Sequence, residues 1–240
     1  EIAAIQPELL AHHYSEAGLS SQAMVYWQRA GNRALERSAH LEAISHLTKG
    51  LEVRKTLPDT PERTRQELDL QTVLGPALIA TKGYAALEVE QAYARARALC
   101  QQLGEAPQLF PALFGLRLFY QQRAEFRSAR ELEEQLFRLA QQVEDPTLLV
   151  VSHQALGTSG YWLGEFAQAR VHLEQGSALY DPEPHRALTF RAIQNPGVAC
   201  LAFVGRVLWT MGLPDQALQR SDASLTLARE LAHPFSLVYA

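Results

Sequence analysis

The sequence predicts an all-α protein, a superhelix built from successive helical hairpins. Apolar residues recur at spacings of three and four along most of the 240 residues, as expected for amphipathic helices. Glycine and proline fall mostly between these segments, where helices end. One pattern of small and large residues returns several times, and its clearest copy spans residues 156–182. Together these observations favour a helical-repeat solenoid.

The clearest copy has a physical role for each of its marked positions. Gly157 lets the first helix approach its partner closely, and Gly164 can take the left-handed conformation that ends this helix. Phe166 fills the corner between the helices, Ala169 is small where they cross, and Pro182 cannot continue a helix. The spacing matches the tetratricopeptide (TPR) repeat, a helix-turn-helix unit of about 34 residues.

The N-terminal part predicts two overlapping copies. We expect a helix over residues 7–17, with Gly18 at its end, and a second over residues 21–37. Small and large residues in the segment after His40 indicate a third helix. The second copy thus begins before the first has finished, and the helix over residues 21–37 belongs to both copies. The next helix begins after Thr60, a good N-cap followed by proline.

The central part departs from the regular repeat in two places. The interval from Gly75 to Ala92 is longer than standard, which predicts an extended loop between the helices. The next pair is expected over residues 108–122 and 125–143. There Arg117 occupies the small position, which indicates a widened helix crossing or a shifted register.

The C-terminal part restores the pattern. We expect a short helix or turn over residues 185–193, a new helix near Pro196, and a final segment that begins a helix without its partner. Residues 1–240 are therefore predicted to form a single TPR-like solenoid of about six irregular helical pairs. Because the chain starts without methionine and stops inside an apolar pattern, we expect a fragment of a larger protein.

Composition narrows the class of protein. The formal charge of −4 and the pI near 6.1 argue against nucleic-acid binding. Cys100 and Cys200 lie in apolar periodic segments and are expected to be buried thiols, which favours a cytoplasmic location. No apolar run reaches the length of a membrane span, so no membrane partner is expected.

Sequence motifs of catalysis and cofactor binding are missing. The chain has no phosphate-binding GxxxxGK[ST], no GxGxxG, no GxSxG and no HExxH. His12 and Glu16 are spaced to share a helix face, but no third metal ligand stands at useful spacing. We therefore expect no enzyme active site, no metal and no cofactor in this segment.

The remaining candidate is a binding surface. In a TPR solenoid, particular positions of each first helix point into the concave groove, where aromatic and amide side chains suit a bound peptide or protein helix. The alternative is that these aromatic residues only pack between neighbouring repeats. The predicted partner-binding residues are Phe114, Gln121, Gln122, Gln154, Thr158, Tyr161, Trp162, Arg206 and Trp209.

Several sequence segments resemble a known protein family, and this resemblance spans essentially the whole chain. PELLAHHYSEAGL, LGPALIATKGY, HLEQGSALYDP and GLPDQALQRS resemble the C-terminal TPR region of large bacterial signalling proteins. Those proteins carry a class III adenylate/guanylate cyclase or another output domain, then an AAA/STAND-type ATPase. The resemblance implies a non-catalytic, cytoplasmic docking arm whose partner is a protein or peptide, including the parent's own ATPase or cyclase domains.

A second function class stays open. The chain would be a small-ligand receptor if its superhelix enclosed an inducer. Such a receptor would be similar to the maltotriose-responsive transcription activators of the STAND type. A deep pocket closed on both sides favours the receptor, whereas an open groove favours the docking arm.

We predict that far-ultraviolet circular dichroism of the chain gives a helix-dominated spectrum, because every periodic segment has the spacing of a helix. A substantial β-strand contribution to the spectrum would contradict the predicted fold.

Overall fold

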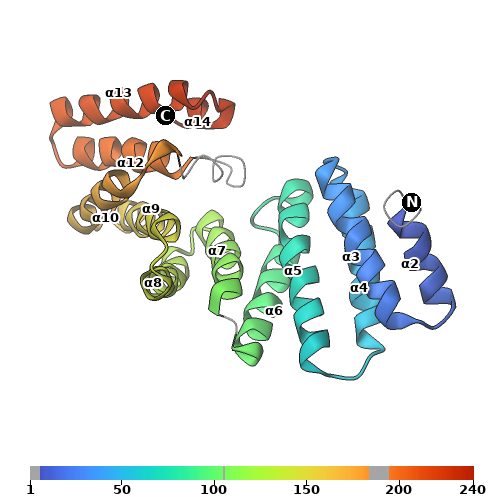
Figure 1. The fold of residues 1–240 in the computed structure, drawn as a ribbon. Helices are drawn as coiled ribbons and strands as arrows, with labels where there is room; N and C mark the ends of the chain where they lie inside the picture. Colours follow the sequence, from blue (N-terminus) through green and yellow to red (C-terminus); the bar gives the residue numbers. More distant parts are fainter. Residues whose placement is uncertain (1–5, 105, 184–194) are drawn as a thin grey trace. The chain divides into compact units, whose positions relative to one another are not determined.

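Every regular element among the described residues is a helix. A computed structural model describes residues 6–104, 106–183 and 195–240, and it contains no strand within those ranges (Figure 1). The chain divides into two compact units, a first unit of Glu1–Arg123 and a second unit of Ala124–Ala240. The predicted all-α, TPR-like helical-repeat fold is confirmed.

In the first unit each described helix packs against the next one along the chain, and α5 also contacts α3 and α7. This is the pattern of a solenoid, in which contacts stay between neighbours. The helices are α2 (Pro7–Glu16), α3 (Ser20–Glu36), α4 (His40–Lys55), α5 (Pro61–Lys82), α6 (Leu87–Leu103) and α7 (Ala106–Gln122).

Helix α5 begins as predicted, but the connection that follows it is short. Thr60 caps it by accepting a hydrogen bond from the backbone N–H of Arg63 at 3.4 Å, with Pro61 in the first turn. The expected extended loop before α6 is wrong, because α5 continues through an apolar stretch to Lys82 and the connection spans only residues 83–86. Gly83, with φ of 85°, stops the helix.

The second unit repeats the same neighbour-to-neighbour packing, and α12 also contacts α9 and α14. Asp145 and Asn195 cap α9 and α12 through their side-chain oxygens, each accepting two backbone N–H groups. The turn expected over residues 185–193 lies outside the described residues. The helices are α8 (Phe126–Val143), α9 (Pro146–Trp162), α10 (Phe166–Leu179), α12 (Pro196–Thr210), α13 (Pro214–Glu230) and α14 (Pro234–Tyr239).

The α9–α10 hairpin matches the roles predicted from its sequence. Gly157 faces Leu173 so closely that a Cβ atom placed there would lie 2.3 Å from the Leu173 Cγ. Gly164 has φ of 78° and ends the turn, and Ala169 is buried where Gly160 approaches it. Small residues thus set the distance between the two helices.

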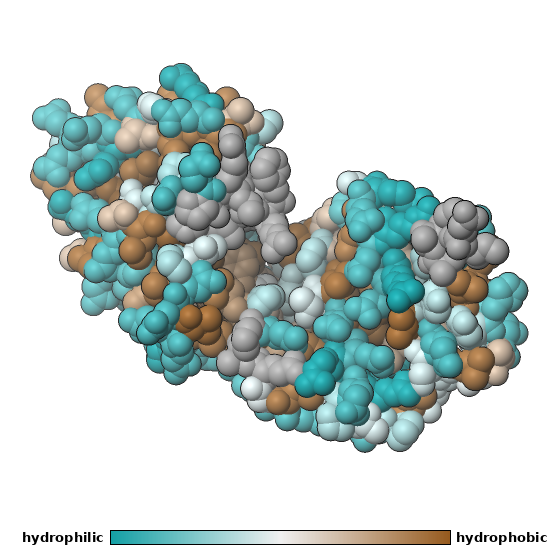
Figure 2. Space-filling model, in the orientation of Figure 1, coloured by the Kyte–Doolittle hydropathy of each residue, from teal (hydrophilic) through white to brown (hydrophobic). Residues whose placement is uncertain are grey.

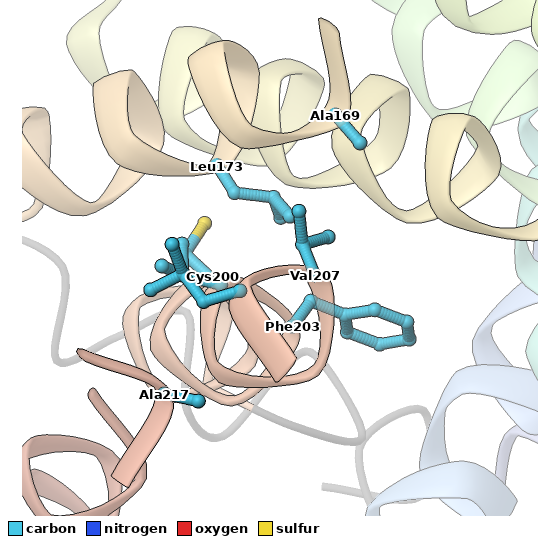
Figure 3. Packing of buried hydrophobic residues seen from close by; sticks show 8 residues of the cluster. Ala169, Leu173, Cys200, Phe203, Val207 and Ala217 are labelled. Carbon is cyan, nitrogen blue, oxygen red and sulfur yellow. The ribbon is translucent and has the colours of Figure 1, made fainter. Parts of the chain in front are cut away.

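The hairpin is held to α12 and α13 by a buried apolar cluster. Leu173 of α10 points towards α12 and ends beside Val207, in one cluster with Cys200 and Phe203 of α12 and Ala217 of α13 (Figure 3). Cys200 is fully buried, as is nearly all of Cys100 in the first unit, in agreement with the prediction for both thiols. Phe166 packs against this cluster from the corner of the hairpin.

Helix α7 uses a different small residue from the one predicted. Gly115, rather than position 117, makes the close approach: a Cβ there would lie 2.4 Å from the ring of Tyr93 in α6. Arg117 is itself buried, with 2% of its surface exposed, and its guanidinium lies 5.0 Å from the ring centre of Phe114. The shifted-register alternative therefore describes the contact between α7 and α6.

We predict that Gly157→Ala destabilises the protein. Alanine normally stabilises a helix interior by about 1 kcal/mol relative to glycine, but overpacking at Leu173 costs about 1–3 kcal/mol. Chemical unfolding of wild type and variant gives the sign of the change in the free energy of unfolding. The exposed Gln168→Ala on α10 is the control and should change stability by less than about 0.5 kcal/mol. A more stable Gly157→Ala variant would contradict the close packing.

Candidate functional site

In each unit, alternate helices form a continuous row. Helix α5 contacts both α3 and α7 in the first unit, and α12 contacts both α9 and α14 in the second. We call these the first row and the second row. In TPR-type folds such a row of first helices lines the concave side, so the rows are the candidate surfaces for a partner.

The second row is nearly free of charge. Helices α9, α12 and α14 contain a single Asp, Glu, Lys or Arg residue, Arg206. Helices α8, α10 and α13 carry the charged residues of this unit, for example in RSARELEEQLFR of α8. Figure 2 accordingly shows a largely hydrophilic visible face on the second unit, interrupted by separate hydrophobic patches.

Aromatic rings connect the three helices of the second row. Trp162 of α9 stacks on Phe126 with ring centres 5.8 Å apart, and 49% of its surface is exposed. Phe203 of α12 lies 5.5 Å from Tyr161 and 6.3 Å from Tyr239 of α14. Tyr161 is half-buried in the apolar cluster, so it serves mainly in packing, while about half of the Trp162 surface is accessible.

Arg206 and Trp209 are both exposed residues of α12. The Arg206 guanidinium carbon lies 4.7 Å from the ring centre of Phe203 and 5.6 Å from that of Tyr239. These distances suit cation–π contacts, which orient the guanidinium. Trp209 is 70% exposed, a large apolar surface for a residue in a packed helix.

Two predicted groove residues are internal. Gln154 and Thr158 of α9 are 5% and 2% exposed. The Gln154 side-chain amide donates to the Thr158 hydroxyl at 3.0 Å, and that hydroxyl donates to the backbone carbonyl of Gln154 at 2.7 Å. Their polar groups are satisfied within the helix, so they are not within reach of a partner in this structure.

The predicted residues of the first unit surround Arg117 of α7. Phe114 lies half-buried beneath its guanidinium, and Gln121 accepts a hydrogen bond from Arg117 Nη1 at 2.6 Å. Gln122 is exposed at the end of the helix. The structure therefore joins Phe114 and Gln121 in one local cluster and leaves Gln122 at its edge.

The first row holds a hollow that sequence reasoning missed. It has a volume of about 360 Å³ and is partly open to solvent. Its polar lining comes from three helices, and the sequence alone does not say which faces of these helices meet. The spacing of Asp69, Thr72 and Val73 does indicate that these three residues share one helix face. The lining residues are Gln28, Asp69, Thr72, Val73, Gln108 and Pro111.

A histidine pair between α9 and α10 was also missed. His153 and His172 face each other with their Nδ1 atoms 3.1 Å apart, and the ring of Phe137 packs against both. Burial, together with the neighbouring His172, lowers the pKa of His153 to about 4. Burial and the charge of Arg130 lower the pKa of His172. Near neutral pH both rings are therefore uncharged, and one N–H donates to the other ring.

Buried charges in the second unit tie helices together. Glu133 of α8 is fully buried and accepts a hydrogen bond from the Ser159 hydroxyl of α9 at 2.7 Å. Arg130 reaches Glu165 at the start of α10 at 3.0 Å. Because these contacts join neighbouring helices, we assign them to packing.

Metal binding finds no support among the described residues, which contain no group of three His, Cys, Asp or Glu side chains placed to hold an ion. Within those same ranges, no helix combines the length and the apolar character needed to cross a membrane.

The sequence has a distant relative among known proteins. No family model matches the chain. An uncharacterized protein of Rhizobium meliloti (strain 1021) is 25% identical over 219 residues, which cover 90% of this chain. The match spans only 21% of the Rhizobium protein.

Solved structures of helical-repeat proteins are similar over most of the chain. The apo form of RapI has a TM-score of 0.72 at 16% identity, covering 86% of this chain and 70% of that one. NprR in complex with its cognate peptide NprX has a TM-score of 0.62 at 14% identity, covering 99% and 66%. TPR-like repeats of a putative kinesin light chain from Podosopora anserina score 0.64 at 18% identity, covering 85% and 93%. At these identities the likeness shows the fold.

We predict that stability falls as pH drops from 6.5 towards 4. A folded-state pKa of His153 below its ordinary value of 6.5 means that the unfolded chain takes up the proton first, so acid favours unfolding. Unfolding free energies measured at pH 7 and pH 5 test this.

The variant His153→Gln should reduce that pH-dependent loss by on the order of 1 kcal/mol, allowing for solvent screening. The exposed His12→Gln is the control and should leave the loss unchanged. An equal pH dependence in wild type and His153→Gln would contradict the buried neutral pair.

Proposed function

We propose that the chain is a non-catalytic docking module of a regulatory protein and that it captures a peptide or protein segment on the second row. The observation that carries this is the exposure of Trp162 and Trp209 on helices whose other apolar residues are largely buried. Tryptophan exposed in this way contributes strongly to binding when a partner covers it.

The similar structures support a peptide ligand. NprR was solved with its cognate peptide NprX, and a Rap protein that covers 91% of this chain was solved with competence and sporulation factor. Those peptides belong to those proteins. For this chain they support a ligand class, namely a short segment held by helical repeats.

A segment of the parent protein is the specific partner we favour. The sequence of the chain resembles that of the TPR arm of cyclase- and ATPase-containing signalling proteins. The Rhizobium relative extends far beyond the matched region, as a multidomain protein would. In this reading the docking module binds its own ATPase or cyclase domains and thereby regulates them in the cytoplasm.

The small-ligand receptor is favoured by one observation, the hollow in the first row. Its volume of about 360 Å³ is within the range of ligand pockets. Such pockets are mostly apolar and enclose their ligand. This hollow opens to solvent and four of its six lining residues are polar, so the docking module remains the better account.

Selection from a phage-displayed library of random dodecapeptides tests the proposal. We expect the chain to enrich peptides, and Trp209→Ala to weaken the enriched peptides by about 2–4 kcal/mol, the range of interface hot spots. Because Trp209 is mostly exposed, the variant should keep the melting temperature of the wild type.

Leu218→Ala is the matched control, since Leu218 is 64% exposed but lies on α13, outside the second row. It should bind the enriched peptides like the wild type. Failure to enrich any sequence, or equal losses in Trp209→Ala and Leu218→Ala, would count against docking on this row.

A further inference from the structure

The charge of the second row points to the chemistry of its occupant. Arg206 is the only Asp, Glu, Lys or Arg residue in the described helices α9, α12 and α14. The row therefore offers one positive charge on a surface otherwise made of apolar and neutral polar groups. A partner that carries one negative charge at the matching position would complement it.

Arg206 is held in place without being neutralised. Its guanidinium lies against Phe203 and Tyr239 at 4.7 and 5.6 Å from the ring centres. No carboxylate of the described residues forms an ion pair with it, and the residue is exposed. The rings restrict the side chain but use none of its N–H donors, so the planar fork remains available for a bidentate acceptor.

Trp209 supplies the apolar half of the same site. It stands three residues after Arg206 on α12, and residues at this spacing lie on one helix face. Trp162 of α9 also contacts Phe203, with 6.4 Å between the ring centres. The second row thus combines the charge of Arg206 with two indole rings that are 49% and 70% exposed, and such rings suit apolar side chains next to an acidic one.

We infer that the second row recognises an acidic segment, in which one Asp or Glu carboxylate pairs with Arg206 and a neighbouring apolar side chain packs on Trp209. This deepens the proposed docking function and rests on it. A side-chain carboxylate, with one negative charge and two acceptor oxygens, matches a single guanidinium. A phosphate group carries up to two negative charges and is usually met by more than one basic residue, and this row has one.

The test compares matched peptides. The tightest peptide from the library is synthesised with an acetylated N-terminus and an amidated C-terminus, and its Asp or Glu is replaced by Asn or Gln. We expect the neutral peptide to bind about 10- to 100-fold more weakly, the range for hydrogen bonds to charged groups. Raising the salt concentration should weaken the acidic peptide and leave the neutral one nearly unaffected.

Variants of the chain, measured with the same acidic and neutral peptides, complete a double-mutant cycle. Arg206→Gln should bind the acidic peptide as weakly as wild type binds the neutral one, and Arg206→Lys should recover part of the loss. Arg220→Gln, at an exposed arginine on α13 outside the row, is the matched control and should bind like wild type. Melting temperatures of all variants show whether each is folded.

The outcomes separate the inference from the proposed function. If Trp209→Ala weakens binding but the neutral peptide binds as well as the acidic one, the inference of an acidic segment is wrong, while the proposed docking function stands. If only peptides with a free C-terminus or a phosphoserine respond to Arg206→Gln, the side-chain carboxylate is wrong. If no peptide depends on Trp209, the docking function itself fails.

Discussion

The structure depends on close helix contacts at small residues. Gly157 receives the side chain of Leu173, and in the first unit the ring of Tyr93 fits between Gly75 and Gly115, where a Cβ at either glycine would lie 2.3–2.4 Å from it. Each contact leaves no room for even one more carbon atom. Because such contacts recur from hairpin to hairpin, the spacing of neighbouring helices is set locally, as in other repeat proteins.

This packing decides which side chains stay exposed. Tight crossing buries much of α9, so Gln154 and Thr158 satisfy each other inside the helix. The side chains that remain accessible stand near the ends of α9 and α12, and they include Trp162, Arg206 and Trp209. The same constraint that holds the repeat together thus leaves an exposed aromatic and cationic edge.

The fold was largely predictable because its signals are local. Gly157, Gly164 and the cap at Thr60 act within one hairpin, and each has the predicted role. The predictions that failed depended on where a helix stops and which side it presents: α5 runs on to Lys82, and Gly115 makes the close approach in α7. The groove residues were predicted from repeat positions alone, which do not distinguish buried Gln154 from exposed Trp209. The contact of His153 with His172 requires the relative rotation of two helices, which sequence spacing does not supply.

The central claim is that a partner covers the second row, and the fluorescence of Trp209 tests it most directly. In a chain carrying Trp27→Phe and Trp162→Phe, Trp209 is the single tryptophan, and its exposure makes it accessible to acrylamide quenching. Saturation with a library-selected peptide should shift the emission to shorter wavelength and reduce quenching severalfold, because the indole becomes buried. Unchanged emission and quenching at saturation would contradict docking on this row.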